Sequence, residues 1–454
     1  MALRSDQEKC AHLLRRFGLG ASEAEVQFYL GGGGINSAVE RLLAYDKQDE
    51  GFNLDINGIA PVDKKLNMPI AIGWWIARLV RTQRPLQERM TLFWHNHFAT
   101  SAEKVKAPGM MVTQNETLRT NATGNFRALL MQVSQDPAMI FWLDNEYNVK
   151  GKANENFARE VMELFTLGIG NYSEQDIQQS ARAFTGWTLK RNQANPGYPA
   201  FRYNERAHDY GEKTFFGRTG NFGGEDIINM LCDNPRTSQF ITQKLWKMMV
   251  YPDPSPEVVN HFAGVFRDSG LELKALLRAI MTSDEFYSEK AERAIYKSPV
   301  DFVVASARQL GLGGYLLEAG NIRRIQPMNQ ALKGMGMQLM YPPDVSGWEH
   351  GQAWVTTATM VERIAWADRL FGGRDQRPLL EIQAYDLYRE DPTPSGVARK
   401  LVSIFDAPLP DSKIQQLRQA AEHASGGRLG VDNANATSQA VARLIFASPE
   451  FQLC

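Results

Sequence analysis

The sequence predicts a mainly α-helical globular protein. Apolar residues recur at helical spacing along most of the 454 residues, whereas strand-like alternation is scarce and no βαβ rhythm appears. The composition, 43% hydrophobic and 22% charged, is typical of a soluble protein with a large core. We expect a large helical domain over residues 1–371 and a small helical subdomain over residues 372–454, either separate from the first or continuous with it.

Local signals order the predicted helices along the chain. Ser37 and Glu40 have the spacing of a capping box for a helix over residues 38–43, and the glycine run 31–34 before it is expected to be a flexible connector. Pro85 suits the first position of the next helix, because its missing N–H group has no partner to lose there. Further helices are predicted over residues 158–167, 173–184, 225–231, 238–249, 256–266, 273–281, 299–310, 357–370 and 438–447.

The charge balance, the cysteines and the first residues exclude several classes of protein. The formal net charge is −1, so no strong overall field favours nucleic acid or an anionic membrane as a partner. No apolar stretch approaches the length of a membrane span, and no membrane insertion is expected. Cys10, Cys232 and Cys454 lie far apart without CxxC spacing, which predicts buried or terminal free thiols. The charged start lacks the apolar run of a signal peptide, so the chain as written is expected to be cytoplasmic.

The segment 154–168 carries the most information. Three carboxylates, an arginine and two asparagines fall within one predicted amphipathic helix. Glu155, Arg159 and Glu163 form a polar stripe at i, i+4 and i+8, which is either an exposed salt-bridge ladder or part of a site. Glu160 lies instead at the margin of the apolar arc, where a carboxylate is either paired or has the raised pKa that suits a general acid.

A second polar cluster contains His95, Asn96 and His97. On a strand the two imidazoles would face the same side and could share a metal ion, whereas on a helix they diverge by about 200°. The preceding residues predict a helix, so a shared metal site requires that helix to break near Trp94. The structural alternative is one histidine satisfied in the core and one at the surface.

Two loops complete the set of candidates. His208 and Asp209 lie in a loop rich in Asn, Gly and Tyr, and they could bind a metal or act as a base, although such dipeptides are common. Trp348 and Trp354 follow two prolines in a second loop, where they could stack on a sugar ring or pack the loop onto the core. Trp187 presents the same choice.

Taken in order, these motifs resemble the DUF1800 family, a bacterial family without an assigned function. The resemblance runs nearly end to end and rests on residues 12–21 (HLLRRFGLGA), 93–98 (FWHNHF), 154–160 (NENFARE), 163–168 (ELFTLG), 181–187 (ARAFTGW), 208–209 (HD), 297–299 (KSP) and 342–348 (PPDVSGW). Members are often exported and often encoded beside sulfatase-like DUF1501 proteins, so the resemblance implies such a partner. A signature centred on His, Asn, Arg and Glu also implies a shared polar site.

Two hypotheses follow. The first is a hydrolase that acts on a carbohydrate or other cell-envelope polymer, with a divalent metal ion as the candidate cofactor. Its predicted catalytic residues are Glu160, Glu163, His95 and Arg159, its substrate-binding residues are Asn154, Asn156, Trp187, Trp348 and Trp354, and its metal ligands are His95, His97, His208 and Asp209. The second is a non-enzymatic helical scaffold for a DUF1501-like partner, in which the same polar side chains form a buried network. The hydrolase requires that imidazoles and carboxylates from distant segments meet in one pocket.

Overall fold

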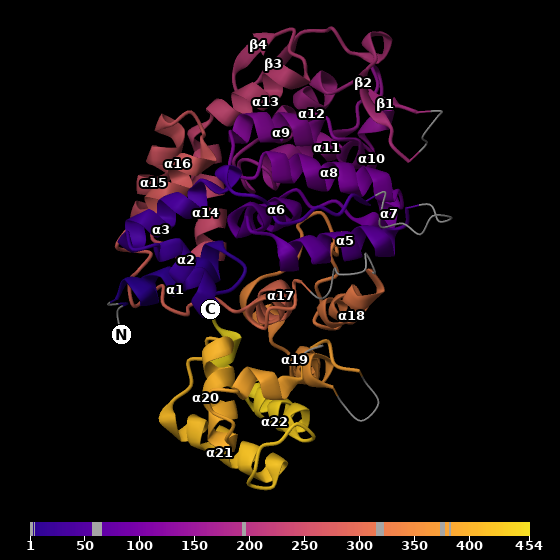
Figure 1. The fold of residues 1–454 in the computed structure, drawn as a ribbon. Helices are drawn as coiled ribbons and strands as arrows, with labels where there is room; N and C mark the ends of the chain where they lie inside the picture. The colour runs from indigo at the N-terminus through magenta and orange to yellow at the C-terminus, as the bar shows by residue number, and fades with distance from the viewer. Residues whose placement is uncertain are drawn as a thin grey trace.

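The computed structural model describes residue 3 and residues 5–56, 66–192, 197–314, 322–372, 377–380 and 383–454. The described chain is mainly helical, as predicted, and its strands form two small antiparallel hairpins. In Figure 1 the hairpins lie at one end of the molecule and the C-terminal helices at the other, with the remaining helices between them. Within the described residues, no helix has both the length and the apolar character needed to cross a membrane.

The N-terminal helices begin at strong capping signals. The elements are α1 (Asp6–Phe17), α2 (Glu23–Leu30), α3 (Gly34–Leu43) and η1 (Tyr45–Lys47). Ser5 caps α1 and Ser22 caps α2, each in a capping box with the glutamate three residues later. The predicted start of α3 at Ala38, with Ser37 as its cap, is wrong, because the helix already begins at Gly34. The glycine run is therefore a short turn: Gly31 caps the end of α2 in a left-handed conformation, and only three residues separate the two helices.

The central helices follow, and several of them start at proline. They are α5 (Met68–Arg81), α6 (Pro85–His97), α7 (Ala102–Val105), α8 (Pro108–Thr120), α9 (Phe126–Ser134), α10 (Pro137–Trp142), η2 (Asn145–Tyr147), α11 (Glu155–Glu163) and α12 (Glu174–Ala183). Pro85 opens α6 as predicted, and the helix continues without a break through His97. Helix α11 ends at Glu163, four residues before the predicted end, and leaves the carbonyl groups of its last turn free to accept other donors.

The two hairpins were not predicted. Strand β1 (Trp187–Lys190) pairs with β2 (Ala200–Tyr203), and β3 (Lys213–Phe215) pairs with β4 (Arg218–Gly220), with η3 (Glu205–Ala207) between them. Each strand has only three or four residues, too few to show the alternation by which strands are recognised in a sequence.

The second half of the chain has the predicted helices close to their predicted positions. It contains α13 (Gly224–Asp233), α14 (Pro235–Met249), α15 (Pro256–Asp268), α16 (Leu273–Met281), α17 (Pro299–Gln309), η5 (Ile322–Ile325), α18 (Gln326–Gly334), η6 (Gly351–Trp354), α19 (Thr357–Phe371), η7 (Ala384–Tyr388), α20 (Pro394–Ile404), α21 (Asp411–Ser425), α22 (Ala434–Ala447) and η8 (Pro449–Gln452). Helix α16 has the predicted bounds, while α14 begins three residues earlier than predicted, at a proline that Asn234 caps. Helices α18, α20 and α21 were not predicted.

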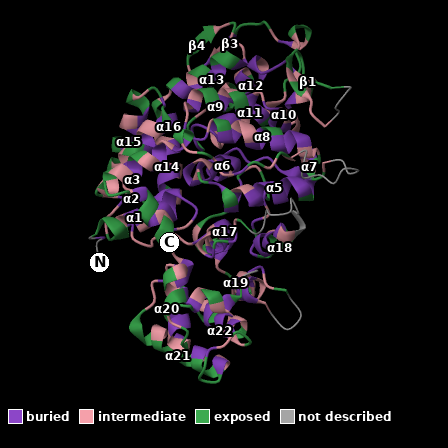
Figure 2. Cartoon of the chain, viewed as in Figure 1, coloured by how far each residue is buried: buried purple, intermediate pink, exposed green. Residues whose placement is uncertain are grey.

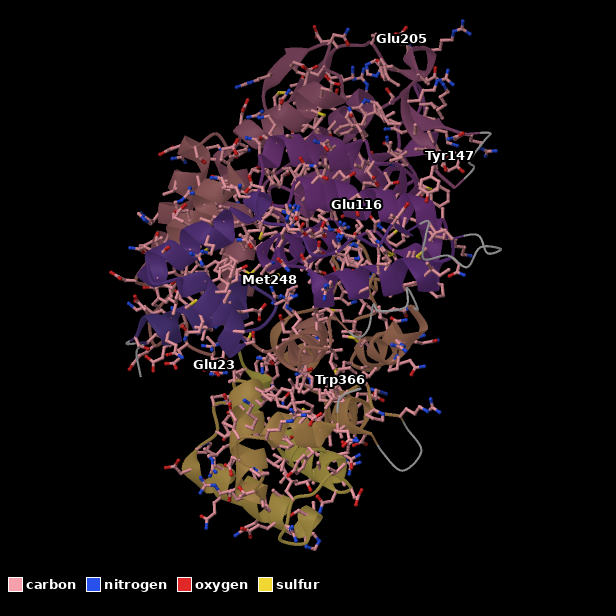
Figure 3. The ribbon with its side chains drawn as sticks, in the orientation of Figure 1. Glu23, Glu116, Tyr147, Glu205, Met248 and Trp366 are labelled. Atoms are coloured by element: carbon pink, nitrogen blue, oxygen red, sulfur yellow. The ribbon has the colours of Figure 1, made fainter. Side chains whose placement is uncertain are left out.

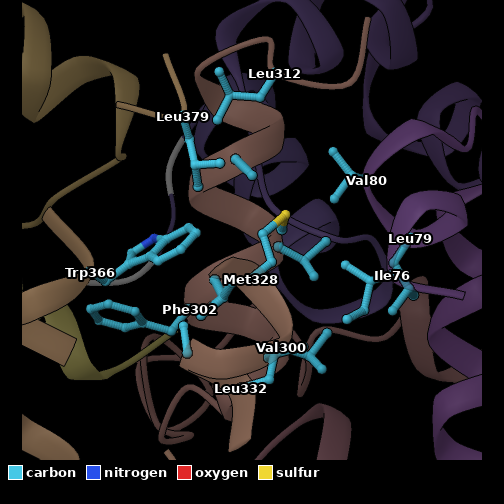
Figure 4. Packing of buried hydrophobic residues seen from close by; sticks show 14 of the residues in the cluster. Ile76, Leu79, Val80, Val300, Phe302, Leu312, Met328, Leu332, Trp366 and Leu379 are labelled. Atoms are coloured by element: carbon cyan, nitrogen blue, oxygen red, sulfur yellow. The ribbon is translucent and has the colours of Figure 1, made fainter. Parts of the chain in front are cut away.

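Two hydrophobic cores hold these helices together, and α6 lies between them. One core joins α1, α3, α6, α9, α11, α14 and α16. The other joins α5, α8, α17, α18, α19, α20 and α22, and Figure 4 shows part of it, where Ile76, Val300, Met328 and Trp366 converge. Helix α6 contributes Leu92 to this second core and Trp94 to the first. It is therefore buried on nearly all sides, as Figure 2 shows.

The C-terminal helices are tied to the rest of the chain at two places. Trp366 of α19 and Val441 of α22 belong to one core cluster, so packing continues across the predicted boundary at residue 372. Lys297 N donates to Gln452 O at 2.7 Å, and Cys454 N donates to Ile295 O at 2.8 Å. These bonds place the last residues beside α1 and the start of α17, as Figure 1 shows.

Candidate functional site

A pocket of about 640 Å³ opens where the end of α6 meets α14, the segment before α17 and the loop that leads into η6. Its aromatic walls are Phe93, Phe240, Tyr296, Trp348 and Trp354. Its polar lining includes Asn96, His97, Gln243, Lys244, His350 and Gln352. Met248, which also lines it, lies near the middle of the helical body in Figure 3. A concave site with apolar walls and a few converging polar groups is the usual form of a small-molecule site.

His97 and Lys244 form the polar contact at the base of this pocket. Nε2 of His97 lies 3.1 Å from the carbonyl oxygen of Phe165, and a carbonyl can only accept, so this nitrogen carries the proton. Nδ1 therefore has a free lone pair, and Nζ of Lys244 donates to it at 3.2 Å. Lys244 also donates to Leu164 O at 3.2 Å. The backbone thus fixes both the tautomer of the imidazole and the direction of the amine.

Burial without a neighbouring carboxylate in the described chain lowers the pKa values of both Lys244 and His97. Burial lowers the pKa of Lys244 to about 8, and no carboxylate lies within ion-pair distance of its amine in the described residues. Burial, and then the charge of Lys244, lowers the pKa of His97 well below its ordinary value, so the imidazole is neutral at pH 7. The carbonyl group that holds the amine, that of Leu164, follows the C-terminus of α11, where the helix dipole is negative. The pair therefore offers a proton donor near neutral pH and an acceptor in mild alkali.

Asn96 holds the tryptophan loop against α6. Its Oδ1 accepts from Trp348 N at 2.7 Å, and its Nδ2 donates to His350 Nε2 at 2.8 Å. Gly347 has φ +87°, and a Cβ built there would lie 2.6 Å from the backbone oxygen of Asn96. Close approach and positive φ both require glycine at this position. The Asn of the His-Asn-His motif is thus a positioning residue for one wall of the pocket.

One of the two carboxylates that line the pocket in the described chain, Asp301, is already engaged. Asp301 Oδ1 accepts from Arg89 Nη2 at 2.5 Å, and its Oδ2 accepts from Ser298 Oγ at 2.7 Å and Ser298 N at 3.1 Å. Burial opposes its charge, but Arg89 and Ser298 hold the pKa of Asp301 below its ordinary value. Asp301 is consequently an ionised structural group rather than a proton donor.

His95 faces away from this pair. Its ring packs edge-on to Trp75 at 5.0 Å and tilted against Trp348 at 5.5 Å between ring centres, and it is 2% exposed. Burial lowers its pKa to about 3, so it stays neutral in water at any ordinary pH. Both histidines of the motif are buried, which corrects the expectation that one of them lies at the surface. The cause is the position of α6 between two cores.

The polar side chains predicted on α11 contact residues outside the pocket. Arg159 pairs with both oxygens of Glu174, at 3.0 and 2.9 Å, and Glu163 accepts from the hydroxyl of Tyr172. Burial, and then Glu163, raises the pKa of half-buried Glu160, as its place at the margin of the apolar arc predicted. Neither Glu160 nor Glu163 lines the pocket.

The two asparagines at the start of this helix hold backbone. Asn154 caps α11 through Asn156 N at 3.0 Å and donates to Asp144 O at 3.0 Å. Asn156 donates to Leu143 O at 3.2 Å. These contacts fix the loop before α11. A substrate-binding role for either residue stays a prediction, as do the catalytic roles of Glu160, Glu163, Arg159 and His95.

The remaining candidates lie beside the first hairpin. His208 is 4% exposed, and its Nδ1 donates to Thr185 O at 2.8 Å. Asp209 accepts from Arg182 Nε at 2.8 Å, and this bond lowers the pKa of the carboxyl to about 2. Trp187 is buried at the start of β1 against Phe184. These three residues have structural partners and do not line the pocket.

The predicted metal ligands do not assemble. In the part of the chain that the structure describes, no group of three or more His, Cys, Asp or Glu side chains is arranged to hold a metal ion. His95, His97, His208 and Asp209 each contact a different set of neighbours, so the expectation that they share a metal site is corrected here. The physical reason is that α6 continues as a helix and turns its two imidazoles apart.

Of the predicted residues, the pocket unites His97, Trp348 and Trp354. Sequence reasoning missed Lys244, the central amine. Its only signal is that it follows Phe240 by four residues and precedes Met248 by four, on a face of α14 beside the one that carries the buried Ile241 and Leu245. A lysine on such a face is normally an ordinary surface residue, so the pattern alone does not distinguish it.

Comparison with known proteins places the chain in a family but assigns no activity. The family model described as "Protein of unknown function (DUF1800)" matches residues 12–453. No curated protein and no solved structure matches the chain.

Proposed function

Because the chain belongs to the DUF1800 family, whose function is unknown, we propose a function from its pocket: hydrolysis of a carbohydrate-containing polymer. The observation that carries the proposal is the Lys244–His97 pair at the base of an aromatic-walled pocket. A buried amine with a depressed pKa, in a cleft and without a carboxylate partner, is a frequent mark of a reactive site.

The lining favours a ring-bearing, hydroxyl-rich ligand. Trp348 and Trp354 are 5% and 6% exposed, so each offers an edge or part of a face to the pocket while the rest of the ring is fixed by packing. Amide and imidazole groups of Gln243, His350 and Gln352 can exchange hydrogen bonds with hydroxyl groups. A volume of about 640 Å³ suits a ligand of one to a few rings.

In this proposal, Lys244 carries the proton. Below about pH 8 its ammonium gives a proton to the leaving oxygen as the scissile C–O bond breaks, while water adds to the carbon and then returns a proton to the amine. His97 stays neutral and acts through Lys244, which makes it a positioning residue. Asp301 is committed to Arg89 and Ser298, so we assign it no proton transfer.

Binding and turnover of defined saccharides test the proposal. Tryptophan fluorescence should change on titration with chitotetraose, cellotetraose or a muramyl-peptide fragment, because Trp348 and Trp354 line the pocket. Lys244→Met should abolish turnover, and Trp354→Ala should weaken binding, whereas Lys333→Met, at an exposed position on α18, should change neither. If none of the saccharides binds at millimolar concentration, the substrate class is refuted.

A second candidate function is binding without chemistry, as in the predicted scaffold for a DUF1501-like protein. One observation favours it: the pocket offers no pair of unengaged carboxylates of the kind that most glycoside hydrolases use, since its two carboxylates among the described residues are Asp253 and Asp301, and Asp301 is bound by Arg89. In that case an apolar or aromatic segment of the partner would occupy the pocket. Capture of a purified DUF1501-like protein by the wild type, lost in Trp354→Ala and kept in Lys244→Met, would favour this function over hydrolysis.

A further inference from the structure

A second polar cluster lies outside the pocket, where α1 meets the segment before α17 and the C-terminal residues. Five cationic side chains gather there, namely Arg15, Arg16, Arg293, Lys297 and Arg363. They come from distant parts of the sequence, and two of the motifs singled out above, HLLRRFGLGA and KSP, contribute three of them. The carboxylates that act on the cluster in the described residues are Asp301 and Asp406.

Both carboxylates already have cationic partners. Asp406 accepts from Arg15 Nη1 at 2.7 Å and from Arg293 Nη2 at 3.1 Å. Asp301 accepts from Arg89, which is a sixth cation. A negative charge at Cys454 also acts on the cluster, since it raises the pKa of Arg16 against the larger effect of burial. The cations still outnumber the negative groups, and an uncompensated buried charge is strongly unfavourable.

Several donors of the cluster have no acceptor. Among the described residues no partner is found for the buried atoms Nε of Arg15, Nε and Nη1 of Arg16, Nη1 of Arg293 and Nε of Arg363. Lys297 is 7% exposed, and its ammonium lies 3.3 Å from the centre of the Phe451 ring without a carboxylate in ion-pair distance in the described chain. Burial, and then Arg293, lowers the pKa of Lys297 to about 7, as expected of an ammonium that lacks a counter-ion.

A small cavity lies inside the cluster. It has a volume of about 20 Å³ and is lined by Arg15, Lys297, Asp301, Asp406, Ser306 and Cys454, among others. A cavity of this size has room for about one particle as large as a water molecule. Of the charged groups on its wall, Asp301 is paired with Arg89, and Asp406 is paired with Arg15 and Arg293. Cys454 adds a negative charge, while the Lys297 ammonium lacks a carboxylate in ion-pair distance in the described chain and Arg15 Nε lacks an acceptor there.

We propose that this cavity binds one monatomic anion of the size of chloride, held by Lys297 and Arg15. The anion joins two segments, because Arg15 belongs to α1 and Lys297 precedes α17. Arg15 also pairs with Asp406, which follows α20, so the site lies where the C-terminal helices meet the body of the protein. The site is independent of the proposed hydrolase, since it shares only the engaged Asp301 with the pocket.

Bromide provides the direct test, because it resembles chloride in charge and size and scatters X-rays anomalously. Crystals of the wild-type protein soaked in sodium bromide should show an anomalous peak in the cavity between Lys297 and Arg15. A peak elsewhere only, or electron density that refines as water alone, would overturn the proposal. This measurement uses only the wild-type protein, so its outcome does not depend on whether a variant folds.

Thermal unfolding gives an independent readout in solution. At equal ionic strength, the Tm in sodium chloride should exceed that in sodium gluconate by about 2 °C or more, and the rise should saturate with chloride. Lys297→Met should lose this response, while Lys333→Met should keep it. Equal Tm values in both salts for the wild type would contradict the site and would leave the proposed hydrolase untouched.

Discussion

Nζ of Lys244 on α14 lies 3.2 Å from Nδ1 of His97 on α6, and the carbonyl groups of Leu164 and Phe165 hold the two side chains from behind. The central signature of the family thus contributes backbone oxygens to this contact rather than its carboxylates. Three segments that are distant in the sequence have to fold together before the amine is buried. The amine then lacks a counter-charge, and several measurable consequences follow from that.

Replacing Lys244 by methionine should stabilise the protein while it abolishes turnover. Burial lowers the pKa of this amine from 10.5 to about 8, so between these values the unfolded chain holds a proton that the folded chain lacks. The contribution of Lys244 to the free energy of unfolding therefore rises as the pH rises from about 8 to 10.5, and it is lowest below pH 8. Lys244→Met should raise the free energy of unfolding at pH 7 by about 1 kcal/mol or more, and the gain should vanish near pH 10.5.

Urea unfolding at pH 7 and pH 10 measures this effect. Lys247→Met is the matched control, because Lys247 lies one turn later on the same helix and is exposed. Its free energy of unfolding should change by less than about 0.5 kcal/mol at either pH. A Lys244→Met variant that is less stable than wild type at pH 7 would contradict the account of an uncompensated amine.

Adding a methyl group to Gly347 should displace the tryptophan loop. The new Cβ would lie 2.6 Å from the backbone oxygen of Asn96, at a residue with φ +87°. We expect Gly347→Ala to lower the free energy of unfolding by about 2–4 kcal/mol and to weaken ligand binding in the pocket. Gly351→Ala has a similar φ, +72°, but its Cβ would meet nothing within 4 Å, so only the backbone strain of about 1 kcal/mol applies. Equal losses in the two variants would show that the contact with Asn96 is unimportant.

Asp136 should make the protein less stable as the pH rises from 4 to 7. This buried residue caps α10, and burial raises its pKa from 3.8 to about 7. Between these values the unfolded carboxyl is charged and the folded one is protonated, so stability declines by up to about 1.4 kcal/mol per pH unit. Asp136→Asn keeps an acceptor for the cap and should flatten this decline, leaving the variant more stable than wild type at pH 8.

The contribution of Asp209 to stability should have the opposite pH dependence to that of Asp136, and Asp209→Asn tests it. Arg182 lowers the pKa of Asp209 to about 2, so its contribution is present above pH 3.8 and is lost as the pH falls through 2. The substitution should lower the free energy of unfolding by about 1 kcal/mol at pH 7 and by progressively less in acid. Denaturant titrations at pH 3, 5 and 8 distinguish the two carboxylates.

Glu160→Gln separates the predicted helix site from the pocket. Burial and Glu163 raise the pKa of Glu160, so the neutral amide should leave the melting temperature equal or slightly higher at pH 7. Saccharide binding should be unchanged, because Glu160 does not line the pocket. A loss of turnover without a loss of binding would assign catalysis to Glu160 after all. Lost binding would place the substrate against α11 instead.

The helical class and about half of the helices in the described chain could be predicted, because they depend on local properties. Periodic apolar residues mark α14 to α17 and α19 without reference to the rest of the fold, and proline begins α15 and α17 at the predicted first residue. The errors lie where a tertiary contact overrides a local signal. Ser37 resembles a cap but lies within α3, and the short strands beside Trp187 are stabilised by their pairing rather than by their own sequence.

The candidate site could be predicted only in part. The sequence by itself determined that α6 is a helix rich in aromatic and polar residues and that Glu160 lies at the edge of an apolar face. Only the tertiary structure decided that His97 meets Lys244, that His95 meets Trp75, and that Asn96 holds the loop of Trp348. The physical reason is that burial and charge pairing depend on which distant segments pack together, and helical periodicity specifies the buried face of each segment but not its neighbour.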